Sequence, residues 1–254
     1  RIEKVKVKNE KAPMATDSAQ LTTHTFYIAI VGGGIVGLAT ALQCLQRTPD
    51  VKLCVLEKES EVAAHQTGNN SGVIHSGLYY KPGSAKARTC VDGARRMVEF
   101  CRQHRIPHEI CGKLVVAVSE QELPALAELL RRGQANGVAG ITEIGPERLK
   151  EIEPHAAGIK ALWVPGTGIV DFPAVARKYV ELIRARGGVV STGTRVSAIQ
   201  RKAELQIVST SRGEICTKLF VNCAGLLSDR VASLGGAKPD AKIVPLRGEY
   251  YKLV

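Results

Sequence analysis

The chain has 254 residues, of which 44% are hydrophobic and 23% charged, and it carries a formal net charge of +11 at neutral pH. This composition is typical of a globular protein, and no apolar run reaches the ~20 residues of a membrane-spanning helix, so any membrane contact is expected to be peripheral. The basic residues are spread along the whole sequence, which argues against nucleic-acid binding and favours attraction of anionic ligands.

The first 23 residues differ from the rest of the chain. They are polar, mixed in charge and without hydrophobic periodicity, so we expect a disordered leader at 1–23. A mitochondrial presequence is poor in acidic residues, whereas this segment contains several. The chain starts at Arg1 without Met and stops at Val254 inside a strand-like run, which indicates an incomplete chain. Its seven dispersed cysteines form no C-x-x-C pair and predict reduced thiols with no metal site.

A βαβ unit follows the leader. The apolar, β-branched run at 25–31 predicts a buried strand, and apolar residues at helical spacing predict a helix at 35–46. The turn between them is Gly32-Gly33-Gly34, and a second strand is expected at 51–56. This order of strand, glycine turn, helix and strand is typical of the start of a dinucleotide-binding domain.

Three glycines of this unit, Gly32, Gly34 and Gly37, have the G-x-G-x-x-G spacing. They allow a tight turn, close approach of a pyrophosphate to the backbone, and close packing of helix on strand. Glu57 lies about 20 residues after the third glycine, where a ribose ligand is expected. The alternative for Glu57 is a solvated residue at a strand end. The unit predicts a dinucleotide site but does not distinguish NAD from FAD.

The remaining elements follow from periodicity and turn residues. Helices are expected at 84–104 and at 172–186, the latter with Asp171 as its N-cap. Another helix is expected to begin with a capping box formed by Ser119 and Glu122 and to end near 136–137. A short helix is expected to begin at Ser228. Strands are expected at 113–118, 159–164, 189–191, 195–200, 204–210 and 214–221. Alternating strands and helices with a β-meander predict an α/β nucleotide-binding domain into which a second domain is threaded.

The loop at 65–83 carries a long motif. Residues His65–Gly77 read H-Q-T-G-N-N-S-G-V-I-H-S-G, followed by Leu78-Tyr79-Tyr80-Lys81-Pro82. This segment resembles the L-2-hydroxyglutarate dehydrogenases of the D-amino-acid oxidase/glycerol-3-phosphate dehydrogenase superfamily. The resemblance covers about residues 26–254, and further segments share it: Cys111–Leu114, Thr167–Asp171, Asn222–Arg230 and Ile243–Gly248.

The resemblance implies an α/β fold: a Rossmann-like FAD-binding domain of the D-amino-acid oxidase type with an inserted, incomplete α+β substrate domain. The FAD-binding domain is then expected at 24–105 and 161–236, and the substrate domain at 106–160 and, truncated, at 237–254. The implied cofactor is FAD. The implied reaction is oxidation of L-2-hydroxyglutarate to 2-oxoglutarate by hydride transfer from C2 to flavin N5, with electrons passing to an unidentified acceptor. A mitochondrial location is implied by the family alone.

Such a reaction needs a base for the hydroxyl proton and cations for two carboxylates. His75 is the candidate base, and a purely structural hydrogen-bonding role in its glycine-rich turn is the alternative. Candidate substrate ligands are Tyr80, Lys81 and Arg247, although Arg247 also fits a solvated strand edge. The candidate FAD contacts are Gly32, Gly34, Gly37, Glu57, Thr67, Asn70, Ser71, Val196, Ala224 and Gly225. The alternative to a cofactor contact is ordinary turn geometry for Thr67, Asn70 and Ser71. For Val196, Ala224 and Gly225 the alternative is ordinary strand-end geometry.

Two other functions stay open from the sequence. A related flavin oxidase or dehydrogenase that acts on amino acids or glycerol 3-phosphate would share the fold, and the fold does not choose among them. An inactive flavoprotein fragment is the second alternative, because full-length members of the family continue past this chain with a segment that covers the cofactor.

Overall fold

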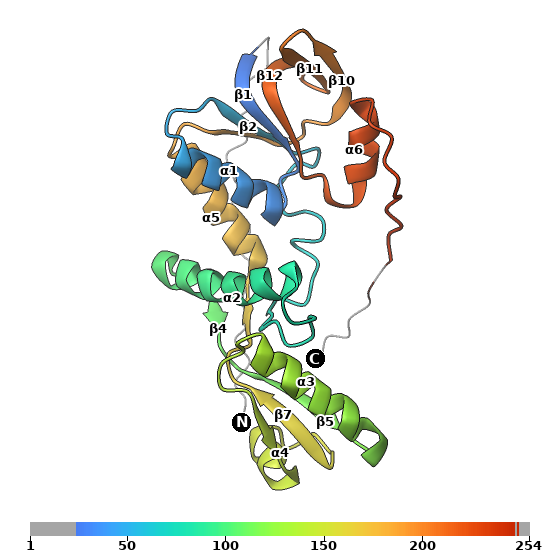
Figure 1. Cartoon of the computed structure of the whole chain (residues 1–254). Helices are drawn as coiled ribbons and strands as arrows, with labels where there is room; N and C mark the ends of the chain where they lie inside the picture. Colours follow the sequence, from blue (N-terminus) through green and yellow to red (C-terminus); the bar gives the residue numbers. More distant parts are fainter. Residues whose placement is uncertain (1–23, 247, 249–254) are drawn as a thin grey trace. The chain divides into compact units, whose positions relative to one another are not determined.

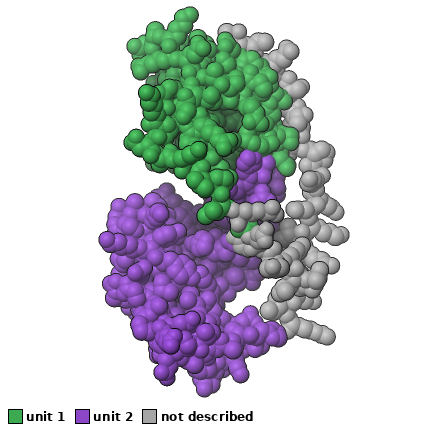
Figure 2. All heavy atoms as spheres, turned by 90° about the vertical axis from the view of Figure 1, so that its right-hand side faces the viewer, with its two compact units in different colours: residues 1–61, 183–254 green, residues 62–182 purple. Residues whose placement is uncertain are grey.

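The computed structural model describes residues 24–246 and residue 248 (Figure 1). The chain divides into two compact units: unit 1 comprises residues 1–61 and 183–254, and unit 2 comprises residues 62–182 (Figure 2). Unit 2 is therefore inserted into the sequence of unit 1, as the predicted threading of one domain into another requires. The described residues contain no helix that combines the length and apolar character needed to cross a membrane.

Unit 1 contains a six-stranded sheet with strand order β10-β11-β12-β1-β2-β9. Strands β12, β1, β2 and β9 are parallel, and β10, β11 and β12 form an antiparallel meander. The strands are β1 (His24–Val31), β2 (Leu53–Leu56), β9 (Val189–Ser191), β10 (Val196–Lys202), β11 (Leu205–Thr210) and β12 (Gly213–Asn222). The helices of unit 1 are α1 (Ile35–Arg47), the short 3-10 helix η2 (Gly225–Leu227) and α6 (Ser228–Leu234). The predicted βαβ unit and meander are confirmed.

The centre of this sheet is apolar on both faces. All four residues of β2 are buried, as expected for a parallel strand that is covered on both sides. Helix α1 buries the predicted apolar face, Leu38, Ala41, Leu42 and Leu45. Cys54 lies in β2, and burial raises the pKa of its thiol to about 12, so it packs there as a small apolar residue.

Unit 2 combines helices with two three-stranded sheets. One sheet has the order β3-β8-β4, and the other has the order β5-β7-β6. The strands are β3 (Val73–Ile74), β4 (His108–Glu109), β5 (Lys113–Ala117), β6 (Thr142–Ile144), β7 (Lys160–Val164) and β8 (Gly168–Val170). The helices are α2 (Ala85–His104), the 3-10 helix η1 (Glu120–Glu122), α3 (Leu123–Ala135), α4 (Pro146–Ile152) and α5 (Phe172–Arg184), which ends just beyond the boundary with unit 1.

The helix starts test the predicted caps. The Asp171 carboxylate accepts a hydrogen bond from the Ala174 N–H at 3.0 Å and caps α5 as predicted. The predicted capping box at Ser119 is wrong, because the Ser119 side chain makes no capping bond and Glu122 accepts from the Val118 N–H at 2.7 Å. The 3-10 turn η1 precedes α3, whose first turn contains Pro124, a residue without an N–H to cap.

The boundaries of the compact units differ from those predicted for the ligand-binding domains. The chain enters unit 2 after Glu61 and leaves it after Leu182, whereas the expected substrate domain covers 106–160. The long helix α2 therefore lies in the inserted unit. Compactness does not assign a ligand to either unit, so the division into an FAD-binding and a substrate domain stays a prediction.

Candidate functional site

The glycine turn of unit 1 is shaped by close backbone packing. Gly32 has φ +112°, and a Cβ added to it would lie 2.2 Å from the Cys223 carbonyl oxygen. A Cβ added to Gly37 would lie 2.0 Å from the Gly32 carbonyl oxygen. Both positions therefore exclude any side chain, and the turn packs against the chain that leaves β12. These contacts explain two of the three glycines of the predicted motif, Gly32 and Gly37.

Among the described residues, no side chain caps the N-terminus of α1. Gly34 is its N-cap, and the first turn contains no acidic residue. The first N–H groups of a helix have no partner within the helix, and the helix dipole is positive at this end. The described residues thus form a backbone cradle that fits the pyrophosphate of a dinucleotide. The predicted phosphate contacts at Gly32, Gly34 and Gly37 lie together in this cradle.

Glu57 lies at the carboxyl end of β2, next to this turn. Its carboxylate accepts hydrogen bonds from the Gly33 N–H at 2.7 Å and from the Glu59 N–H at 2.9 Å. Glu57 therefore fixes the glycine turn. A carboxylate has about four lone-pair sites, so two backbone bonds leave room for a ribose hydroxyl as donor. The ribose contact stays a prediction beside this structural role.

The turn after β12 approaches the same cradle. The Cys223 N–H donates to the Val31 carbonyl at 2.8 Å, and the Ala224 N–H donates to the Asn222 side chain at 3.2 Å. Gly225 has φ +57° and begins η2. The Ala224 nitrogen lies beside the glycine turn, since it would be 3.3 Å from a Cβ on Gly32. The FAD contacts at Ala224 and Gly225 stay predictions. Val196 begins β10 and packs against the apolar core of unit 1.

The polar loop residues predicted to contact the cofactor belong to unit 2. The Asn70 amide donates to the Gln66 carbonyl at 2.9 Å and the Thr67 carbonyl at 2.8 Å, and its oxygen accepts from the Gly72 N–H at 2.7 Å. Asn70 therefore organises its own loop. Thr67 is buried and Ser71 is exposed. Their flavin contacts stay predictions.

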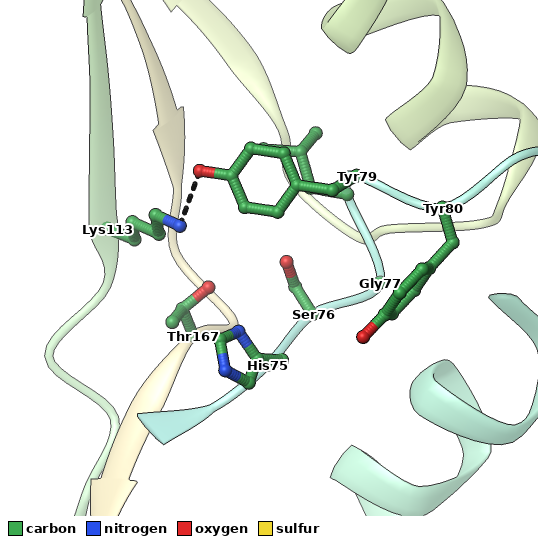
Figure 3. Close-up of a pocket in the computed structure, with 8 residues that line it drawn as sticks. His75, Ser76, Gly77, Tyr79, Tyr80, Lys113 and Thr167 are labelled. Carbon is green, nitrogen blue, oxygen red and sulfur yellow. Dashed lines mark hydrogen bonds between the residues drawn. The ribbon is translucent and has the colours of Figure 1, made fainter. Parts of the chain in front are cut away.

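Unit 2 also contains a small pocket of about 90 Å³ (Figure 3). Its lining consists of His75, Ser76, Gly77, Leu78, Tyr79, Tyr80, Lys113 and Thr167. Two predicted site residues, His75 and Tyr80, are among them. Lys81 is not in this lining; it is exposed, and its carbonyl accepts from the Ser84 hydroxyl at 2.6 Å at the start of α2. Arg247 lies outside the described residues.

The pocket favours an uncharged imidazole at His75. Burial lowers the pKa of His75 from its ordinary 6.5, and the nearby Lys113 ammonium lowers the pKa further. The His75 carbonyl is tied to α2, since it accepts from the Cys90 thiol at 3.2 Å. A neutral imidazole on a fixed backbone has a free electron pair for a proton, which is the property that a general base needs.

Lys113 and Thr167 line this pocket and were not predicted from the sequence. Lys113, on β5, donates to the Tyr79 hydroxyl at 2.6 Å, and its nitrogen lies 4.3 Å from the centre of the Tyr79 ring. Thr167 precedes β8 and is 4% exposed. Both lie in segments that carry the family resemblance, Cys111–Leu114 and Thr167–Asp171, and this resemblance is the sequence signal that could have indicated them as site residues. In sequence, however, a strand Lys and a loop Thr look like ordinary surface residues.

A family model described as "FAD dependent oxidoreductase" matches residues 28–254. Among individual proteins, the chain is 51% identical over 229 residues to an L-2-hydroxyglutarate dehydrogenase of Indibacter alkaliphilus, which covers 90% of this chain and 57% of that protein. It is 44% identical over 253 residues to the human mitochondrial L-2-hydroxyglutarate dehydrogenase, covering 95% of this chain and 55% of that protein. The chain thus spans little more than half the length of these relatives.

Solved structures show the same fold. An FAD-bound L-alpha-glycerophosphate oxidase from Mycoplasma pneumoniae matches 85% of this chain and 58% of its own, with a TM-score of 0.78 and 25% identity. A glycine oxidase from Geobacillus kaustophilus matches 85% of this chain and 60% of its own, with a TM-score of 0.76 and 20% identity. The predicted fold class is confirmed by these likenesses.

Proposed function

This chain belongs to the family of FAD-dependent oxidoreductases, and from that premise we propose that it serves in the oxidation of L-2-hydroxyglutarate to 2-oxoglutarate. FAD, the cofactor expected from the sequence, is the cofactor of the family. The substrate is inferred from identities of 51% and 44% to L-2-hydroxyglutarate dehydrogenases over most of this chain. The observation that carries the proposal in the structure is the pocket that brings His75 and Lys113 together.

The reaction removes a hydride from C2 and a proton from its hydroxyl group. When bound, FAD supplies the hydride acceptor. His75 takes the hydroxyl proton, since its lowered pKa keeps the imidazole neutral at neutral pH.

The cofactor contacts follow from the cradle in unit 1. The N–H groups at the start of α1 bind the pyrophosphate, and Gly34 lets it approach the backbone. Gly32 and Gly37 allow the tight turn and the close packing of helix on strand. Glu57 binds a ribose hydroxyl while it holds the glycine turn through Gly33. The close packing of Ala224 on the Gly32 turn supports a second backbone contact there.

The test is turnover by the purified protein, supplied with FAD and an artificial dye as electron acceptor. L-2-hydroxyglutarate should reduce the dye, and the D enantiomer should not. L-alpha-glycerophosphate and glycine are the control substrates, because the structural neighbours that act on them share the fold. Turnover of either control substrate without turnover of L-2-hydroxyglutarate would overturn the assignment and favour the related oxidases.

The location belongs to the same proposal. Relatives from human, mouse and Caenorhabditis elegans are named as mitochondrial, whereas the name of the Indibacter relative contains no such term. We therefore infer a mitochondrial location, which fractionation of cells that express the protein would test. The electron acceptor and a peripheral contact with a membrane stay predictions.

A further inference from the structure

The pocket of unit 2 has a positive charge that no acidic side chain balances. Its lining contains one ammonium group, that of Lys113, and no carboxylate. Lys113 donates to the Tyr79 hydroxyl, and within the part of the chain that the structure describes it makes no ion pair. An ammonium has three N–H donors, and the bond to Tyr79 uses only one of them. The remaining donors favour an anion as the occupant.

Thr167 provides a second, independent sign of a ligand. Its side chain is 4% exposed, and its hydroxyl oxygen is buried without a hydrogen-bond partner among the described residues. Figure 3 shows this hydroxyl on the pocket side, between Lys113 and His75. Buried hydroxyl groups are nearly always hydrogen-bonded, because leaving one unpaired costs free energy. A ligand oxygen in the pocket would satisfy it.

The backbone holds these groups in fixed positions. Lys113 is the first residue of β5 and pairs with Val164 at the end of β7. The Thr167 carbonyl accepts from the Gly112 N–H at 2.8 Å, and this bond ties the two segments together. Gly112 has φ +76°, and a Cβ there would lie 1.9 Å from the Trp163 ring, so only glycine allows this approach. The donors are therefore arranged before a ligand binds.

We propose that the Lys113 ammonium, the Tyr79 hydroxyl and the Thr167 hydroxyl together bind one carboxylate of the substrate. The Tyr79 oxygen accepts from Lys113, so its own proton points elsewhere and is free to be donated. All three groups then donate to an anionic oxygen, and such charge-assisted bonds are stronger than neutral ones. The identity of this substrate as L-2-hydroxyglutarate rests on the proposed function, whereas the anion site itself does not.

Carboxylate binding would also change His75. The titratable groups that line the pocket with the imidazole are Lys113, Tyr79 and Tyr80, and among them Lys113 lowers the pKa of His75. A bound carboxylate neutralises the Lys113 charge, which otherwise lowers the pKa of His75. The imidazole therefore becomes a stronger base when the substrate is in place. The site couples recognition of the acid group to removal of the hydroxyl proton.

The test measures binding of glutarate, a dicarboxylate with no hydroxyl group to oxidise, by calorimetry on the purified protein supplied with FAD. Lys113→Met should weaken glutarate binding about 10- to 100-fold, and Lys113→Arg should weaken it much less because the charge remains. Thr167→Val should weaken binding about threefold to tenfold without lowering the melting temperature, because no intramolecular hydrogen bond is lost.

A matched control is Lys160→Met. Lys160 lies on β7 of the same small sheet, is paired with Glu143 at 2.8 Å and does not line the pocket. The Lys160→Met variant should bind glutarate with the same affinity as the original protein. A second measurement is the pH profile of kcat/KM, whose acidic limb should move to higher pH in Lys113→Met, because the positive charge that lowers the pKa of His75 is gone.

The outcomes separate this site from the proposed function. Glutarate affinity unchanged by Lys113→Met and Thr167→Val, or no glutarate binding by the original protein, would overturn the carboxylate site. Turnover of L-2-hydroxyglutarate in such a case leaves the proposed function standing. Conversely, glutarate binding that depends on Lys113 in a protein that does not oxidise L-2-hydroxyglutarate supports the site and rejects the substrate.

Discussion

His75 shows how one side chain is prepared for its role by its neighbours. Burial and the Lys113 charge act in the same direction, and both lower the pKa of the imidazole below 6.5. A lower pKa keeps the base unprotonated at neutral pH, although it also makes the base weaker. The backbone of His75 is held independently, through the bond from the Cys90 thiol to its carbonyl. A substitution that removes the imidazole therefore keeps this backbone contact.

Replacement of His75 by Ala tests that role. We expect flavin reduction by L-2-hydroxyglutarate to slow about 10²- to 10⁴-fold, the usual contribution of a general base. FAD content and melting temperature should stay unchanged, since the His75 carbonyl remains and the side chain is only partly buried. Rapid mixing without oxygen, followed by flavin absorbance, measures the rate. Reduction at the original rate would leave His75 with a structural role only.

At this scale the sequence could predict some of the pocket. The long motif around His75 pointed to the imidazole and to Tyr80, and both line the pocket. Lys113 and Thr167 could not be assigned, because their roles depend on an unbalanced charge and an unpaired hydroxyl. Those properties arise only when β5 and the segment before β8 are brought together. Sequence spacing contains no information on which polar atoms lack partners.

At the scale of elements, the glycine turn links β1, α1 and the end of β12. Gly37 lies in the first turns of α1, and a Cβ there would be 2.0 Å from the Gly32 carbonyl oxygen. Helix and strand can approach this closely only without a side chain. Gly93 is also helical, within α2, but a Cβ there would meet nothing within 4 Å. A side chain at Gly37 would therefore clash with the backbone, whereas the structure has room for one at Gly93.

We predict opposite effects on stability for Gly37→Ala and Gly93→Ala. Gly37→Ala should lower the free energy of unfolding by about 1–3 kcal/mol or more, because a backbone oxygen must move. Gly93→Ala should raise it by about 0.5–1 kcal/mol, because alanine restricts the unfolded chain and fits the helix. Urea unfolding of the two variants and the original protein measures both values. Equal tolerance of the two changes would contradict the packing described for the glycine turn.

Long elements could be predicted from the sequence, and short ones could not. Helix α2 runs from Ala85 to His104, against a prediction of 84–104, because a 20-residue amphipathic segment repeats its pattern several times. Strands β3 and β4 contain two residues each, too few for any periodicity. Helix α4, with seven residues, was missed for the same reason.

At the scale of the whole molecule, the insertion of one unit into the sequence of another was predictable. A βαβ unit at one end and a β-meander at the other indicated an interrupted sheet, and β1 indeed pairs with both β2 and β12. Residues 62–105 are expected in the cofactor domain from the family resemblance, and they lie in the compact unit 2; the assignment of a ligand to each unit stays a prediction. Which unit a helix joins depends on contacts with distant residues.

We expect this chain to hold FAD and L-2-hydroxyglutarate to reduce the bound flavin. The most direct measurement is the absorption spectrum of the purified protein, incubated with FAD, freed of excess cofactor and kept without oxygen. We predict a flavin spectrum that is bleached by L-2-hydroxyglutarate and unchanged by the D enantiomer. A colourless protein would show that the chain does not hold FAD, and a bound flavin that stays oxidised in the presence of L-2-hydroxyglutarate would reject this substrate.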